Sequence, residues 1–341
     1  MTKTRLPAEW EQQEGILLPW PHSGTDWVDM LSAVEPVFVQ IARHASRFER
    51  VVIVAPEEAS PHGLLSNKGA RMENITFAGC PTNDTWGRDF GPITVYRNDK
   101  PLPLDFTFNG WGEKYPAGLD NRVTTRLAAK GIFSVSPFVV DMVLEGGSID
   151  CDGKGTLLTT SRCLLNPNRN PQMDRVQIEQ SLLEQLGIER ILWLDHGMLY
   201  GDDTDSHIDI LARFAPDDTI LHVACNDPAD PQYTELREMR LQLETFRTVQ
   251  GEPYNLVPLP LPAPRFNSAG ERLAATYANF LVINGAVLVP VYNDPLDVEA
   301  CAIIASAFPG WEIIGINASP LILQGGSLHC TTMQLPKGVL A

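Results

Sequence analysis

The segment Ala286-Val287-Leu288-Val289-Pro290 is a short apolar run followed by the turn signal Asn293-Asp294-Pro295. Residues 296–307 then form a predicted helix, and Trp311-Glu312-Ile313-Ile314-Gly315 forms a second predicted strand. A strand, a turn, a helix and a strand in this order indicate one α/β unit. The rest of the chain repeats this order.

Five such units can be placed along the chain. In the second unit, residues 106–112 are assigned to an unusually long loop. The first unit has predicted strands at 15–21, 51–56 and 74–78 and a helix around 27–41. The second has strands at 92–96 and 136–144 and a helix at 120–130, and the third has strands at 156–160 and 190–194 and a helix at 172–186. The fourth has strands at 219–223 and 256–261 and a helix at 231–248, and the fifth is the unit described above. Units of this size cannot bury their faces alone, so we expect one α/β domain over residues 1–341. A doubly wound sheet is the alternative fold.

Composition narrows the possible functions. The net charge of −16 argues against a nucleic-acid partner and fits attraction of a cation. No apolar run approaches the about 18 residues of a membrane helix, and the first residues lack the apolar core of a signal peptide. The six cysteines include no CxxC pair, which favours reduced thiols in the cytoplasm over disulfides or a structural zinc.

Polar residues stand at the ends of four of the five units. They are Asp89 after the first unit, Glu145 after the second, His207 and Asp209 after the third, and Cys330 after the fifth. On a strand, His207 and Asp209 would point to one face. By the same rule, His329 would point away from Cys330, so it is not included in the predicted site.

Each of these residues also has a structural interpretation. Cys330 could be a small core hydrophobe, since free cysteine is often buried. The segment from His207 to Asp209 could be a solvent-facing strand edge. The interpretation as a site depends on all four segments meeting in space.

The residue types in this set indicate a particular chemistry. A cysteine with a histidine indicates nucleophilic catalysis by a thiolate. Three carboxylates, from Asp89, Glu145 and Asp209, would raise the pKa of the thiol unless a bound cation cancels their charge. A planar guanidinium both supplies this charge and donates paired hydrogen bonds to carboxylates. The set therefore predicts a guanidine substrate.

Two other classes of function stay open at this level. Asp202, Asp203, Asp205, His207 and Asp209 could hold a divalent metal for hydrolysis, although this leaves Cys330 without a role. A non-catalytic binding module would not need a cysteine and a histidine at matching unit ends. Our prediction is an enzyme without a metal or another cofactor.

Long motifs across nearly the whole chain resemble the agmatine deiminases, a family also named after bacterial peptidylarginine deiminases. The matching motifs are Arg5-Leu6-Pro7-Ala8-Glu9-Trp10-Glu11, Trp20-Pro21-His22, Thr85-Trp86-Gly87-Arg88-Asp89-Phe90-Gly91-Pro92, residues 105–112, Glu145-Gly146-Gly147, residues 201–209, and Gly325-Gly326-Ser327-Leu328-His329-Cys330. The resemblance implies the pentein α/β-propeller of guanidine-modifying enzymes, with five ββαβ modules around a pseudo-fivefold axis.

The resemblance also implies a role for each site residue. Cys330 would attack the guanidinium carbon to give a covalent thiouronium intermediate, and His207 would protonate the departing ammonia and then activate water. Asp89 and Asp209 would bind the guanidinium nitrogens. Glu145 would either contact the guanidinium or orient His207. The remaining substrate-binding residues would be Trp86, Asp203, Gly325 and Gly326.

The substrate implied by the resemblance is agmatine, which would be hydrolysed to N-carbamoylputrescine and ammonia for putrescine and polyamine biosynthesis. Asp202 and Asp203 would suit its ammonium group, whereas free arginine or peptidylarginine would require an arginine such as Arg88, Arg162 or Arg169 for the carboxylate. The loop at 106–111 is a candidate lid. The sequence leaves open whether the chain forms a homo-oligomer.

Overall fold

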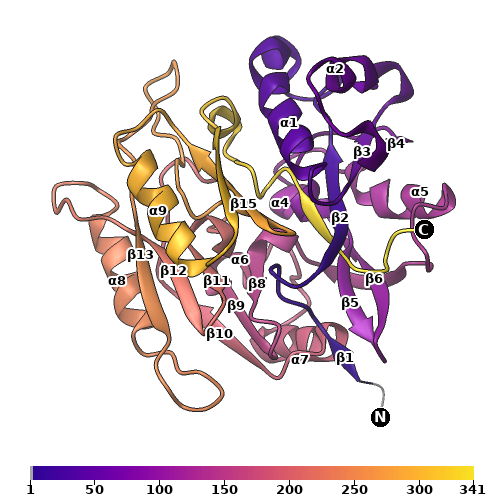
Figure 1. The fold of residues 1–341 in the computed structure, drawn as a ribbon. Coiled ribbons are helices and arrows are strands. Elements are labelled where there is room, and N and C mark those ends of the chain that lie inside the picture. The colour runs from indigo at the N-terminus through magenta and orange to yellow at the C-terminus, as the bar shows by residue number, and fades with distance from the viewer. Residues whose placement is uncertain (1–2) are drawn as a thin grey trace.

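The computed structural model describes residues 3–341 and contains five small β-sheets of three or four strands. In each sheet a central strand pairs with one antiparallel strand and, after a helical connection, with one parallel strand. Parallel strands require such a crossover because a tight hairpin can join only antiparallel neighbours. The longer helices lie outside the sheets (Figure 1).

The last three units have the same order of elements. In the third unit β8 (Ile149–Cys151) and β9 (Thr156–Thr160) are antiparallel, α7 (Arg175–Leu186) follows, and β10 (Arg190–Leu194) pairs parallel with β9. The fourth unit consists of β11 (Ala212–Ala215), β12 (Thr219–Ala224), α8 (Tyr233–Leu243) and β13 (Asn255–Pro260). The fifth consists of β14 (Leu281–Ile283), β15 (Ala286–Val291), α9 (Asp297–Ala307) and β16 (Glu312–Asn317).

The first unit is completed by the end of the chain. Its strands β2 (Gln13–Pro19), β3 (Arg50–Ala55) and β4 (Ile75–Gly79) are parallel, with α1 (Leu31–Ala45) between the first two. The antiparallel partner of β2 is β17 (Met333–Pro336), which lies beside it in Figure 1. This pairing joins the two ends of the chain and places Cys330 three residues before a strand of the first sheet.

The second unit is built from β5 (Ile93–Arg97), β6 (Lys100–Thr107), α5 (Val123–Ala129) and β7 (Phe138–Val143), with β1 (Thr4–Arg5) at its edge. The shorter helices are α2 (His62–Asn67), α3 (Gly87–Phe90), α4 (Gly110–Glu113) and α6 (Ser161–Leu164). The α/β class with five ββαβ units is thus confirmed. The pseudo-fivefold axis and the single domain over 1–341 stay predictions.

Two local predictions were wrong. The start of the expected 106–112 loop belongs to β6, which pairs with β5 and β7. The segment Ile208–Ile210 is a 3-10 helix instead of a strand. Its entry is a tight turn in which the Asp202 carboxylate accepts hydrogen bonds from the backbone N–H groups of Thr204 and Ser206. Short polar side chains that bond to the nearby backbone compete with strand formation in this way.

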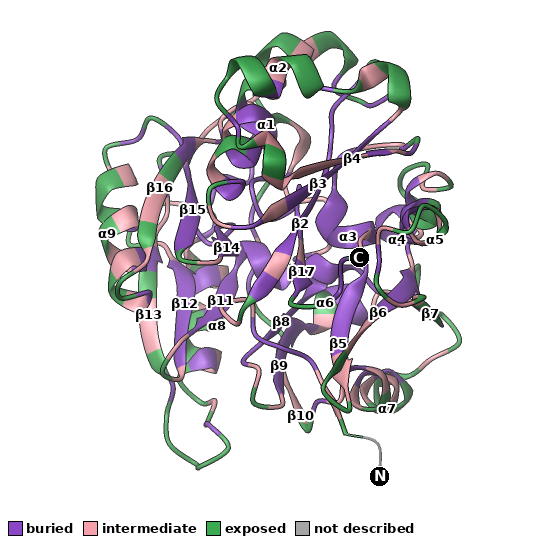
Figure 2. Ribbon diagram, turned by 45° about the vertical axis from the view of Figure 1, so that its right-hand side comes forward, coloured by how far each residue is buried: buried purple, intermediate pink, exposed green. Residues whose placement is uncertain are grey.

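The central strands β9, β12, β15 and β2 are almost wholly buried, whereas the helices expose their outer faces (Figure 2). Strands buried on both faces carry continuous apolar runs, which is why they were recognisable in the sequence. Within residues 3–341, no helix has the length and apolar character needed to cross a membrane. The polar residues of interest lie in the loops and short helices beyond these strands.

Candidate active site

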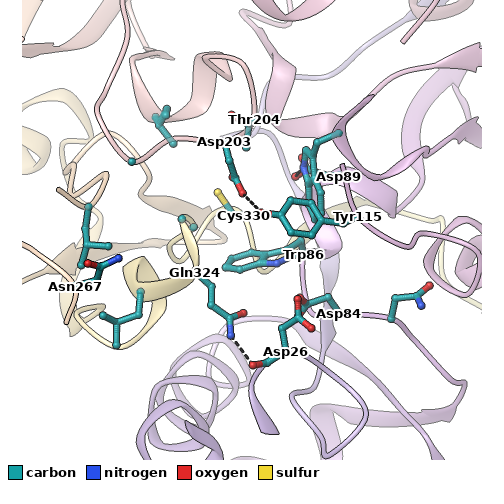
Figure 3. Close-up of a pocket in the computed structure, with 18 of the residues that line it drawn as sticks. Asp26, Asp84, Trp86, Asp89, Tyr115, Asp203, Thr204, Asn267, Gln324 and Cys330 are labelled. Carbon is teal, nitrogen blue, oxygen red and sulfur yellow. Dashed lines mark hydrogen bonds between the residues drawn. The ribbon is translucent and has the colours of Figure 1, made fainter. Parts of the chain in front are cut away.

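A cavity of about 740 Å³ reaches inward to Cys330 (Figure 3). Six of the nine predicted site residues line it: Trp86, Asp89, Asp203, Gly325, Gly326 and Cys330. The other three, Glu145, His207 and Asp209, are fully buried next to it. The structure therefore brings together residues that are separated by up to 244 positions (330 − 86) in the sequence.

Cys330 lies in a turn that is held by the side chain of Asn279. The Asn279 Oδ1 atom accepts hydrogen bonds from the backbone N–H groups of His329 (3.0 Å) and Cys330 (3.3 Å). These two donors fix the amide orientation, so the Nδ2 group faces Cys330 Sγ at 3.2 Å. Burial raises the pKa of Cys330 well above its usual value, Asp209 and Asp89 raise it further, and Asn279 opposes this shift. The thiol therefore needs a cation nearby to ionise.

The two carboxylate oxygens of Asp209 have different environments. Oδ2 lies 2.7 Å from His329 Nδ1, 3.2 Å from Asn279 Nδ2 and 3.6 Å from Cys330 Sγ. Oδ1 is buried and has no hydrogen-bond partner. Burial raises the pKa of Asp209, but the hydrogen bond and charge of His329 lower it more, so it lies below the ordinary value. The expected strand direction of His329 was wrong, because residues 328–331 form a turn.

Asp89 is the carboxylate that faces both the cavity and His207. Its Oδ2 accepts a hydrogen bond from Trp111 Nε1 (2.9 Å), and its Oδ1 accepts one from the backbone N–H of Gly147 (3.0 Å). Burial raises the pKa of Asp89 to about 6. A Cβ at position 147 would lie 2.6 Å from His207 Nδ1 and 2.8 Å from Asp89 Oδ1. The glycine pair after Glu145 is thus explained by the space that the site requires.

Trp111 belongs to the segment that we considered as a lid. Its backbone lies in the left-handed region with φ of 57°, a conformation that costs free energy in a non-glycine residue and is concentrated at functional sites. The side chain is buried against Phe108, with ring centroids 4.9 Å apart, and donates to Asp89. Trp111 therefore forms part of the cavity wall and fixes Asp89.

His207 is completely buried, and neither ring nitrogen has a hydrogen-bond partner. Its nearest carboxylate oxygen is Asp89 Oδ1, 3.7 Å from Nδ1. Burial lowers the pKa of His207, but Asp89 and other negative groups outweigh this effect and raise it well above the usual value. A positively charged imidazole with unused N–H groups is suited to donate a proton.

Glu145 is clamped by an arginine behind His207. Arg169 Nε lies 2.9 and 3.0 Å from the two Glu145 oxygens, and both side chains are buried. Arg169 also contacts Asp205 at 2.7 Å. Glu145, Cys163 and His207 each have one potential metal-ligand atom, and these three atoms lie within 4.8 Å of one another. Glu145 therefore lies on the His207 side of the site and does not line the cavity.

Gly325 and Gly326 shape the cavity wall around Trp86. A Cβ at position 326 would lie 2.0 Å from Trp86 Cζ3. Gly325 has φ of 82°, in the region that favours glycine. A Cβ there would lie 3.2 Å from Asp203 Oδ1, and the Asp203 carboxylate accepts a hydrogen bond from Tyr115 at 2.7 Å (Figure 3).

The cavity lining carries six acidic residues, although burial raises the pKa of Asp84 to about 7 and that of Asp120 to about 8. Its acidic residues are Asp26, Asp84, Asp89, Asp120, Asp203 and Glu271. Arg272 is the one cationic side chain in the described lining, and Asp230 neutralises it through two contacts of 2.8 and 2.9 Å. Of the arginines considered for a carboxylate-bearing substrate, Arg88 pairs with Glu9 and Arg169 pairs with Glu145. The cavity is thus suited to a ligand with positive charge at both ends.

The acidic segment 202–209 does not form a carboxylate cage for a metal. The Asp202 side chain caps the turn, and Asp205 pairs with Arg169 and with Lys114, the latter at 2.9 Å. Asp203 bonds to Tyr115, and Asp209 bonds to His329. Over residues 3–341, the potential metal ligands that converge are Glu145, Cys163 and His207, and Arg169 occupies the Glu145 oxygens.

Five ββαβ units around a buried cysteine, a histidine and paired carboxylates define the class of guanidine-modifying enzymes. Residues 5–336 match the family model described as Porphyromonas-type peptidyl-arginine deiminase, and the chain belongs to that family.

A protein of Vibrio parahaemolyticus provisionally named agmatine deiminase is 34% identical over 97% of this chain and 96% of its own length. The structure of a C. jejuni agmatine deiminase, a cysteine-to-serine variant with substrate bound, has a TM-score of 0.93 and 39% identity, covering 99% of this chain and 98% of that one. A Porphyromonas gingivalis structure provisionally named arginine deiminase has a TM-score of 0.94 and 46% identity, covering 99% of this chain and 100% of that one.

Reasoning from the sequence missed four residues of the site. Asn279 and Glu9 lie far from any predicted unit end, and His329 was excluded on strand geometry. Trp111 was considered only as part of a lid. Glu9, Trp111 and His329 all stand in the motifs that carry the family resemblance, which was the available signal for them. Asn279 stands in an apolar stretch where a buried amide needs hydrogen-bond partners, but its partners are remote in sequence.

Proposed function

We propose that this chain hydrolyses agmatine to N-carbamoylputrescine and ammonia. The observation that carries the proposal is the acidic cavity that ends at Cys330, in which Asp230 neutralises the single lining arginine, Arg272. Agmatine has a guanidinium at one end and an ammonium at the other. Free arginine would bring a carboxylate into this negative field, which costs free energy.

The names of similar proteins support the same substrate. The Vibrio parahaemolyticus relative and the substrate-bound C. jejuni structure both carry the name agmatine deiminase. The Porphyromonas gingivalis protein provisionally carries the name arginine deiminase, so the two substrates must be compared directly. We place the reaction in cytoplasmic putrescine and polyamine biosynthesis, as the family resemblance implies.

The first half-reaction forms a covalent intermediate. When the cation binds, the negative field of Asp209 and Asp89 no longer opposes ionisation of Cys330, and the thiol proton is released to water. The thiolate attacks the guanidinium carbon and forms a C–S bond. His207 gives its proton to the amine nitrogen, the C–N bond breaks, and ammonia leaves a thiouronium cation. Asp89 and Asp209 bind the guanidinium nitrogens.

The second half-reaction hydrolyses this intermediate. His207, now neutral, takes a proton from water while the oxygen attacks the same carbon. The C–S bond breaks, the thiolate returns, and the remaining hydroxyl proton passes to water, where the ammonia released earlier becomes ammonium. When the product leaves, the thiolate regains a proton from water. Glu145, clamped by Arg169, stabilises the positive charge of His207. Trp86 packs along the aliphatic part of the substrate, with Gly325 and Gly326 leaving room, and Asp203 faces the ammonium.

The test is ammonia release from agmatine, free arginine and a blocked peptidylarginine, by wild type, by Cys330→Ala and in the presence of EDTA. We expect release from agmatine that survives EDTA and disappears in Cys330→Ala. Release of ammonia only from arginine or from the peptide would show that the substrate is not agmatine, but it would leave the cysteine mechanism in place. Release that EDTA abolishes, or that Cys330→Ala leaves intact, would contradict the cysteine mechanism.

A further inference from the structure

The imidazole of His329 lies between two buried carboxylates behind the nucleophile. Its Nδ1 is 2.7 Å from Asp209 Oδ2, and its Nε2 is 2.7 Å from Glu9 Oε1. Asp209 Oδ2 in turn lies 3.6 Å from Cys330 Sγ. A chain of contacts therefore runs from Glu9 through His329 and Asp209 to the reacting sulfur.

Glu9 is the fixed end of this chain. Its carboxylate contacts Arg88 at 3.0 Å and Arg213 at 2.5 Å, and Arg213 also pairs with Asp150. Burial raises the pKa of Glu9, but Arg213, His329 and Arg88 together hold it well below the usual range. Glu9 is therefore an ionised acceptor, held by two arginines, at the back of the imidazole.

The charges around His329 decide where its protons lie. An ionised carboxylate can only accept hydrogen bonds, so both ring nitrogens donate when the imidazole is doubly protonated. Burial, Arg213 and Arg88 lower the pKa of His329, and Glu9 and Asp209 oppose them without reversing the shift. When one proton is lost, the remaining one stays on Nδ1, because Asp209 has no arginine partner and is the more basic neighbour. The Nδ1–H group thus faces Asp209 in both states, whereas the Nε2 contact with Glu9 is a hydrogen bond only in the doubly protonated state.

This donor explains why the two oxygens of Asp209 differ. Oδ2 is saturated by His329, Asn279 and Cys330, whereas the buried Oδ1 has no partner. A carboxylate that is free to rotate would exchange the two oxygens and lose its orientation. With Oδ2 fixed from behind, Oδ1 stays available for a guanidinium N–H group in front.

We propose that His329, anchored by Glu9, is a positioning residue that fixes and ionises Asp209, so that Asp209 Oδ1 is presented to the guanidinium of the substrate. The inference rests on the proposed deiminase function for its kinetic readout. Its structural part, the Nδ1–H bond to Asp209, does not depend on the identity of the substrate.

The charged and titratable groups that face this unit come from several elements. Asp209 and His207 belong to the segment around the 3-10 helix Ile208–Ile210, Arg213 to β11, Arg88 and Asp89 to α3, and Asp150 to β8, while Glu9 and Cys330 lie in loops. His329 is the group that lowers the pKa of Asp209 most, and without it burial raises this pKa against only His207 and Arg213. The activity requires ionised Asp209 as well as ionised Asp89, so the acid limb of kcat/KM, which Asp89 sets in the wild type, must then become steeper or move to higher pH.

A matched pair of variants separates the two ends of the imidazole. In His329→Asn the amide nitrogen takes the place of Nδ1 and can still donate to Asp209. In His329→Gln the amide nitrogen takes the place of Nε2 and donates only to Glu9. We expect His329→Asn to keep kcat/KM for agmatine within about 5-fold of wild type and to keep the acid limb. We expect His329→Gln to lose about 10²-fold, the cost of a small misplacement at a reacting centre, with an acid limb that is steeper or at higher pH.

His222→Gln is the control for removing a buried imidazole, because His222 lies on β12 with the Val223 carbonyl as its hydrogen-bond partner and away from the active site. The His222→Gln substitution should lower thermal stability without moving the acid limb of kcat/KM. Equal losses in the two His329 variants, with unchanged pH limbs, would reduce His329 to a structural role and overturn the proposal.

A second measurement works without any substrate. In ¹⁵N-histidine-labelled wild type, the proposal requires an imidazole Nδ1–H signal that is protected from exchange, and this signal must be absent in His329→Gln. If wild type lacks the signal, the positioning proposal is overturned whatever the activity. If the signal is present but wild type releases no ammonia from any guanidine, the deiminase function fails and the structural unit stands.

Discussion

The two sides of the reacting cysteine are built differently. On one side, Cys330, Asp209 and His329 are tied together by Asn279 and anchored by Glu9, so that each polar group except Asp209 Oδ1 has a partner. On the other side, His207 is as deeply buried, yet both of its ring nitrogens lack a hydrogen-bond partner. Leaving a buried polar group unsatisfied costs about 1–3 kcal/mol.

This difference matches two tasks. A nucleophile and the carboxylate that orients the substrate must be held in one geometry before the substrate arrives. A general acid and base must instead exchange protons with groups that enter and leave, such as ammonia and water. Bonds within the protein would compete with those transfers. The following experiments test whether the two sides depend on different properties of their residues.

The largest effect is expected from His207→Gln, which removes the proton donor and keeps a similar volume. We expect kcat for agmatine to fall by about 10²–10⁴-fold. The melting temperature should also fall, because the raised pKa of His207 means that its positive charge beside Asp89 stabilises the folded state. A fall in kcat of less than about 3-fold would show that another group transfers the proton.

The next effect concerns Asn279, on the saturated side. Asn279→Asp replaces the N–H donor to Cys330 Sγ by an anionic acceptor, so it should raise the thiol pKa further and lower kcat/KM by about 10²-fold. The direct measurement is the pH dependence of Cys330 alkylation by iodoacetamide, whose midpoint should move to higher pH. An unchanged midpoint would mean that Asn279 only supports the backbone of the turn.

A smaller effect is the pH dependence of the wild type. Burial places the pKa of Asp89 at about 6, and its ionised form is needed to bind a cation. We expect kcat/KM to be independent of Asp89 above about pH 6 and to fall up to tenfold per pH unit below it. A bound guanidinium favours the ionised form, so the acid limb of kcat itself should lie at lower pH. If the acid limbs of the kcat and kcat/KM profiles lay at the same pH, the role of Asp89 in binding the guanidinium would be contradicted.

The smallest effect concerns the shape of the cavity wall. Gly326→Ala would place a Cβ 2.0 Å from Trp86 Cζ3, so either the ring or the loop must move. Overpacking of this kind costs about 1–3 kcal/mol, which should appear as a lower melting temperature together with a higher KM for agmatine. The control is Gly63→Ala in α2, where nothing lies within 4 Å of the added Cβ. Equal stability of the two variants would show that Trp86 is free to move.

Much of the fold could be predicted from local pattern. The strand predicted at 190–194 matches β10, and the helix predicted at 296–307 matches α9 to within one residue. The strand β10 is a short apolar run that is buried only at its end, and α9 is a mostly apolar helix that buries Ala300 and Ile304, so both could be recognised from their local composition and length. The prediction failed at β6 and at residues 207–209. In both segments the backbone conformation depends on partners that are distant or on side-chain hydrogen bonds.

The chemical inventory of the site was also present in the sequence. Cys330, His207, Asp89 and Asp209 are unusual at the ends of apolar strands, and their combination indicated a cationic guanidine. The tertiary structure alone decided how they divide the work. Contacts between units that are far apart in the chain place Glu145 behind His207 and turn His329 toward Asp209. Such a contact also neutralises Arg272.

The sequence by itself thus determined the repeated α/β unit and the set of reactive groups, because apolar periodicity and residue chemistry are local properties. Only the tertiary structure decided which of these groups are saturated and which are left free. Hydrogen bonds and pKa values in a buried site depend on distances of a few ångströms between residues from different units. The pairing of β17 with β2, which brings the last segment of the chain to the first, sets those distances for Cys330.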